Sequence, residues 1–238
     1  MTTLGFALAA ALGNMVGALA VVRSLRRGLR IIDACLAFGA GFMLAVAVLG
    51  VLPEVLQEGE GGALYVLGGY LAVHLAQHVF TPHFHFGEET HRVSASAGVS
   101  ALLGLTLHTF FDGVAIASGF LVSGELGLLL VLAVLLHTLP EGVTIASVMV
   151  AGGQSRRQAL GAAAVLGLAT VLGVVLTERI APLASHGLAI SAGVTIYVAA
   201  SNLVPEFQAK RGWLSALAFF GGAVGFFLTE RLLHLWMR

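Results

Sequence analysis

Charged residues are scarce in this chain of 238 residues. They make up 10% of the sequence, whereas ordinary soluble domains carry about 25%. Hydrophobic types make up 58%, so too few polar side chains are available to cover a surface in water. This composition excludes an ordinary soluble domain and indicates a protein embedded in a bilayer. The 12 basic and 12 acidic residues cancel, and without a basic tract the chain lacks the charge that nucleic-acid binding requires.

Cysteine and strand-like patterns are also missing. The single cysteine, Cys35, excludes an internal disulfide and a zinc site built from cysteines. Apolar and polar residues do not alternate with a period of two, which argues against strands. The chain is rich in glycine instead, with 31 residues. In a membrane, such small residues let helices approach closely.

Long apolar segments are the main positive feature. A membrane-spanning helix needs about 20 mostly apolar residues, and the sequence predicts eight such helices in a single transmembrane domain, residues 1–238. They lie near residues 3–22, 32–56, 62–80, 96–121, 125–150, 158–180, 187–207 and 213–235. The predicted fold class is therefore an all-α integral membrane protein.

The distribution of basic residues predicts the orientation of these helices. The connections between spans 1 and 2, 3 and 4, 5 and 6, and 7 and 8 hold nine of the 12 Lys and Arg residues, and the opposite side holds three. Cytoplasmic loops carry the excess of positive charge in membrane proteins. We therefore expect both termini to lie outside the cytoplasm.

Two internal resemblances suggest a repeat. HTFFDGVAIAS, from His108, and HTLPEGVTIAS, from His137, lie in spans 4 and 5 and share seven of eleven positions. An Ala-Gly pair followed by Pro-Glu occurs at residues 40–54 and again at 192–206, displaced by 152 residues. If span 2 matches span 7, three helices recur after five spans, with inverted topology. This predicts a 3+2+3 inverted repeat, an architecture typical of secondary transporters whose binding site lies near the bilayer midplane.

Spans 4 and 5 carry the chemistry. His108 and Asp112 are four residues apart, as are His137 and Glu141, so each pair lies on one helix face. The alternative is that each pair is a buried hydrogen-bonded pair with a purely structural role. A carboxylate near the bilayer centre is costly, however, and tends to face a partner or a cavity. Two imidazoles and two carboxylates at matched depth predict one shared site for a divalent transition metal such as zinc, since calcium or magnesium would require more oxygen ligands.

At these residues the sequence resembles the ZIP family of divalent metal transporters, especially its short prokaryotic members. HTFFDG is similar to the family's span 4 motif HN-x-PEG, HTLPEG to its span 5 motif [HQ]-[DN]-x-PEG, and AGFMLA at 40–45 to its span 2. The resemblance implies eight spans, outward termini, the 3+2+3 arrangement and a homodimer in the cell (inner) membrane. It also implies that the protein is no enzyme and has no cofactor, and that Zn²⁺, Cd²⁺, Fe²⁺ or Mn²⁺ is its substrate.

The resemblance further implies a set of ligands in spans 2, 4 and 5. They are Met43, His108, Asp112, His137 and Glu141. Without the resemblance, Met43 would be interpreted as a packing residue. Many members bind a second metal through an Asn, an Asp or Asn, and a Glu, where this chain has Thr109, Thr138 and Thr170. Because threonine is a neutral and poor ligand, we expect a single-metal site.

A second histidine-rich region follows span 3. Five of the nine histidines lie between residues 74 and 91, and the predicted topology places the loop of residues 81–95 in the cytoplasm. A secondary, weaker metal site would consist of His83, His85, His91 and Glu88. The alternative is a solvated loop without bound metal.

Two other functions remain open from the residues alone. A membrane-embedded metalloenzyme needs a metal with an open position and a general base, but HExxH is absent and the four polar groups are all used as ligands. A proton-conducting channel could use the same His and carboxylate residues without a metal. Metal entry that depends on His137 and Asp112 would separate transport from both.

Overall fold

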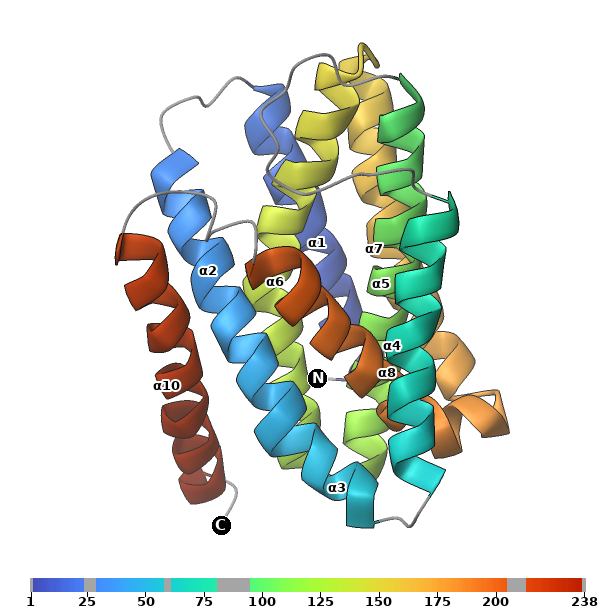
Figure 1. The fold of residues 1–238 in the computed structure, drawn as a ribbon, viewed down its shortest axis with the longest axis vertical. Helices are drawn as coiled ribbons and strands as arrows, with labels where there is room; N and C mark the ends of the chain where they lie inside the picture. The colour runs from blue at the N-terminus through green and yellow to red at the C-terminus, as the bar shows by residue number, and fades with distance from the viewer. Residues whose placement is uncertain (1, 24–28, 58–60, 81–94, 205–212, 237–238) are drawn as a thin grey trace.

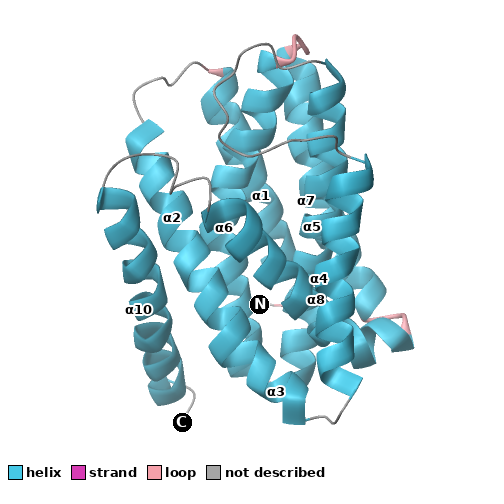
Figure 2. Ribbon diagram, in the orientation of Figure 1, coloured by secondary structure: helices cyan, strands magenta, loops and turns pink. Residues whose placement is uncertain are grey.

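The computed structural model describes residues 2–23, 29–57, 61–80, 95–204 and 213–236 (Figure 1). Every regular element in these residues is a helix, and none is a strand (Figure 2). Seven segments are long and apolar enough to cross a membrane. The predicted all-α membrane class is therefore confirmed.

The described helices follow one another along the chain. They are α1 (Thr3–Val22), α2 (Leu29–Ala45), the π-helix η1 (Val46–Val51), α3 (Leu52–Gln57), α4 (Gly61–Phe80), α5 (Ala95–Val122), α6 (Gly124–Ala151), α7 (Arg156–Thr177), α8 (Ala181–Tyr197), the π-helix η2 (Val198–Leu203) and α10 (Trp213–Trp236). α2, η1 and α3 run on without a break, as do α8 and η2. α4 has 20 residues and is not among the seven.

Among the helix boundaries that differ from the predicted ones, two lie around the connection between α7 and α8. The sixth span was expected to run to residue 180, but α7 ends at Thr177. The seventh was expected to begin at 187, but α8 begins six residues earlier, at Ala181, with Pro182 in its first turn. Proline is favoured there because its missing N–H has no helical partner to lose. The polar residues around His186 hid this start in the sequence.

The outer faces of the helices are apolar. On α1, the exposed residues Leu4, Leu8, Leu12 and Val16 recur every four positions, which places them on one stripe of the helix. α10 is the least buried span and exposes Trp213 to Trp236 along most of its length. Because such large exposed apolar surfaces are unstable in water, these faces are suited to contact with lipid tails.

Glycines bring the central helices into backbone contact. A Cβ added at Gly142 of α6 would meet the backbone of Asn14 in α1, and one added at Gly113 of α5 would meet the backbone of Thr170 in α7. Gly113 and Gly142 occupy the same position in the two HT repeats. α1 therefore packs against α6 through the same kind of glycine contact by which α7 packs against α5.

The outer helices show a second matched pair of contacts. α10 packs along α2, and α4 packs along α8 (Figure 1). A Cβ at Gly222 of α10 would meet Phe38 of α2, and one at Gly193 of α8 would meet Val66 of α4. The two π-helices begin at Val46 and Val198, 152 residues apart, which is the displacement of the Ala-Gly pairs. Of the Pro-Glu pairs, the second lies outside the described residues.

Candidate metal centre

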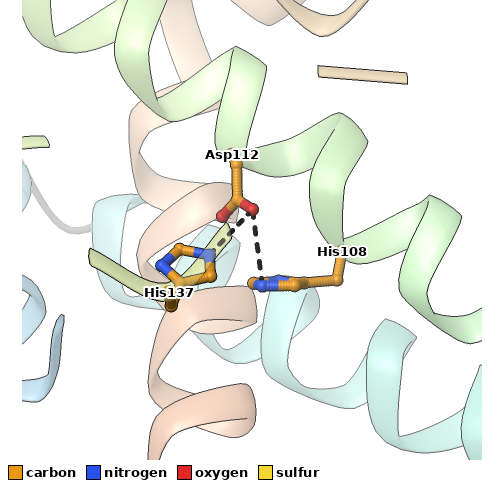
Figure 3. A group of neighbouring side chains, drawn as sticks. All are labelled: His108, Asp112 and His137. Carbon is orange, nitrogen blue, oxygen red and sulfur yellow. Dashed lines mark hydrogen bonds and ion pairs between the residues drawn. The ribbon is translucent and has the colours of Figure 1, made fainter. Parts of the chain in front are cut away.

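Three polar side chains meet between α5 and α6. His108 and Asp112 lie one turn apart on α5, and His137 faces them from α6 (Figure 3). All three are buried, with at most 5% of each residue exposed. The sequence spacing of four residues on α5 therefore places both side chains on the face that meets α6, as predicted.

The distances within this group suit a small metal ion. Oδ2 of Asp112 lies 3.1 Å from Nε2 of His137 and 3.4 Å from Nε2 of His108. One ligand atom from each residue can be chosen so that all lie within 4.8 Å of one another. Ligands about 2.0–2.1 Å from a tetrahedral zinc ion lie about 3.3 Å apart. The three side chains could therefore bind one ion after only small adjustments.

The backbone of α6 determines which nitrogen of the His137 ring carries a proton. Nδ1 of His137 lies 2.8 Å from the carbonyl oxygen of Ala133, and only a protonated Nδ1 can donate to that oxygen. In the neutral ring, Nε2 then carries a lone pair and faces the Asp112 carboxylate. Two such acceptors attract only when a cation lies between them, and both a proton and a divalent metal satisfy this condition. A backbone partner of this kind is typical of metal-binding histidines.

His108 makes fewer contacts than His137. Its ring lies 5.3 Å from the His137 ring, between centroids. Neither of its nitrogens forms a hydrogen bond with another described residue. Both nitrogens are consequently available to a ligand.

Glu141 and Met43 lie outside the group of three. Glu141 is buried on α6, with 7% exposed, and neither of its oxygens forms a hydrogen bond of good geometry among the described residues. Met43 of α2 is 1% exposed and belongs to an apolar cluster. The structure thus brings together three of the five predicted ligands, and the role of the other two stays a prediction.

Thr109, Thr138 and Thr170, expected at the positions of a second set of ligands, are buried and bonded to their own helices. The hydroxyl of Thr109 donates to the carbonyl of Leu105 at 3.0 Å. Thr138 and Thr170 donate to backbone carbonyls three and four residues earlier. Such bonds are common for threonine in helices. The O–H donors of these threonines are therefore used within their own helices.

Two polar residues near the centre were not predicted. Asn14 of α1 is fully buried and packs with its backbone against Gly142. It is the one amide in an otherwise apolar first span, a signal that was present in the sequence. Ser191 of α8 donates to the carbonyl of Phe111, beside Asp112, at 3.1 Å. No sequence signal distinguishes Ser191, because serine is common in such helices.

The secondary site cannot be placed. His83, His85, His91 and Glu88 lie outside the described residues. Of the other residues in this region, His74 lies on α4 and contacts the ring of Tyr197 at 5.7 Å between centroids.

The fold and the centre together define a multi-pass membrane protein with a buried cluster that could hold a metal ion. Comparison with known families agrees with this class: residues 85–232 match the model of the ZIP zinc transporter family. The chain belongs to this family. The matched segment contains α5 and α6 and hence His108, Asp112 and His137. No curated protein matches the chain.

Proposed function

We propose that the chain transports a divalent metal ion, with zinc as the main substrate, across the membrane into the cytoplasm. Members of the ZIP family are transporters rather than enzymes. The observation that carries the proposal is the buried group of His108, Asp112 and His137, whose ligand atoms lie at distances suited to zinc. Both imidazole nitrogen and carboxylate oxygen are ordinary zinc ligands.

The site would hold one ion rather than two. With Asp112 and Glu141 ionised, two carboxylates neutralise one divalent ion, which lowers the cost of placing it in the membrane. The three threonine hydroxyls donate hydrogen bonds to backbone carbonyls of their own helices. A second ion would have to rely on the lone pairs of neutral hydroxyl oxygens, which are poor ligands beside carboxylate and imidazole. Met43 would add a soft thioether ligand, which favours zinc or cadmium over manganese.

The 3+2+3 inverted repeat is proposed as the framework for transport. α1 contacts α6 as α7 contacts α5, and α2 contacts α10 as α8 contacts α4. The displacement of 152 residues between η1 and η2 supports the same pairing. A site between two such halves can be opened to either side by moving one group of helices against the other. The charge distribution favours an orientation in which both termini lie outside the cytoplasm. The cell (inner) membrane is the proposed location, and the homodimer stays a prediction.

Reconstitution tests this function. The purified chain is placed in liposomes that contain a zinc-sensitive dye, and zinc is added outside. We expect zinc entry well above that into protein-free liposomes, with no need for a proton current. A proton current that is independent of zinc would favour the proton channel, and the absence of zinc entry from folded protein would refute the proposal.

Acid should inhibit uptake. Imidazole and carboxylate groups must lose their protons to bind a metal, and a proton that bridges His137 and Asp112 competes directly for the same lone pairs. We expect the KM for zinc to rise as the external pH falls from about 7.5 to about 5.5, across the ordinary titration range of histidine. The measurement is the initial rate of dye response at each pH. Rates that do not vary over this range would contradict competition with protons.

A further inference from the structure

Asn14 is a buried polar residue that the proposed ligand set does not use. It is fully buried in α1, and neither its Nδ2 nor its Oδ1 forms a hydrogen bond of good geometry with any described residue. Buried amides nearly always have hydrogen-bond partners. A buried amide in this environment therefore indicates that a polar group with which it can interact lies nearby.

That group is the carboxylate of Glu141. The backbone of α1 at Asn14 directly contacts Gly142, the residue after Glu141. The Asn14 amide approaches the Glu141 carboxylate, although the two do not close a hydrogen bond of good geometry. Both oxygens of Glu141 and both polar atoms of Asn14 thus share one buried region between α1 and α6.

The matching position on the other side of the site differs. Thr170 of α7 contacts Gly113, the residue after Asp112, as Asn14 contacts Gly142. Thr170 donates its hydroxyl to the carbonyl of Leu166 in its own helix, at 3.3 Å. Asn14 forms no such bond to its helix. Of these two matched positions, Asn14 is therefore the one whose polar side chain is not bonded to its own helix.

We propose that Asn14 is a positioning residue of the transport site, which orients Glu141 toward the ion. Its Nδ2 group donates to one oxygen of Glu141 and leaves the other oxygen for the metal. Glu141 lies outside the group of His108, Asp112 and His137 and has no other described hydrogen-bond partner, so this amide decides how well it can join them. The inference rests on the proposed function, since it concerns the same ion.

Replacement of Asn14 tests the inference. Asn14→Leu keeps the size of the side chain and removes the amide. We expect its zinc Kd, measured by calorimetry in detergent, to rise by about 10–100-fold, the usual effect of losing a partner of a metal ligand. Thr170→Val is the matched control at the equivalent position, and its Kd should stay within about twofold of the parent, because the lost hydroxyl is bonded only to its own helix.

A double-mutant cycle separates positioning from packing. If Asn14 acts through Glu141, Asn14→Leu should change the zinc Kd little when Glu141→Gln is already present. A full additional loss in that background, or an unchanged Kd for Asn14→Leu alone, would overturn the inference. Should Asn14→Leu fail to fold, Asn14→Ala in the same cycle decides. If the parent neither binds nor transports zinc, the proposed function itself is wrong, whereas zinc uptake by the parent with an unchanged Asn14→Leu overturns this inference alone.

Discussion

Replacing Asp112 or His137 by alanine is expected to abolish zinc uptake. Asp112 lies within 3.4 Å of both imidazoles through a single oxygen, and His137 forms a hydrogen bond with the backbone of its own helix. Loss of a partner of a metal ligand costs about 10–100-fold in affinity, so loss of the ligand itself should cost about 100-fold or more. Initial rates in dye-loaded liposomes, normalised to the amount of folded protein, measure the effect.

Two controls make this result specific. Thr109→Val changes a buried neighbour of His108 whose hydroxyl donates only to its own helix, and we expect nearly normal uptake. Asp112→Glu restores the residue typical of the family and should keep measurable uptake. Uptake by Asp112→Ala or His137→Ala equal to that of the parent would show that the ion takes another route.

Gly113→Ala is expected to destabilise the protein, although alanine is the better helix former. A Cβ at residue 113 would meet the carbonyl of Thr170 and force α7 away from α5. Overpacking of this kind costs about 1–3 kcal/mol, which exceeds the gain of about 1 kcal/mol in helix propensity. Because residue 113 follows Asp112, the displacement should also weaken zinc binding.

Gly104→Ala is the matched control on the same helix. A Cβ at residue 104 meets nothing within 4 Å, so only the gain in helix propensity remains. Thermal unfolding in detergent should give a lower Tm for Gly113→Ala and an equal or higher Tm for Gly104→Ala. Equal Tm values for the two variants would mean that α5 and α7 do not pack as closely as described.

The sequence predicted the helical class and most of the spans, because hydropathy over about 20 residues is a strong signal in membrane proteins. It placed the start of α8 six residues too late, because His186 and its neighbours interrupt the apolar run that begins near Pro182. The π-helices were not predicted at all. The two π-helices begin 152 residues apart, as the two Ala-Gly pairs do, and this match became visible only once the backbone was known.

The grouping of His108, Asp112 and His137 could be predicted, because two His-carboxylate pairs at one spacing are rare in apolar sequence. The pairs do not contribute equally, however. Asp112 contacts both imidazoles, whereas Glu141 stands apart from them, beside Asn14. This asymmetry depends on how α5 and α1 pack against α6, and a pattern within single helices does not contain that information.

Diffraction at the zinc absorption edge tests most directly whether the paired helices hold one transported ion. Crystals of transport-competent protein grown with zinc should show one strong anomalous peak bounded by Nε2 of His108, Nε2 of His137 and the carboxylate of Asp112. Its distances to these ligands should be about 2.0–2.2 Å. A zinc-saturated crystal with no peak between these three side chains would contradict the assignment.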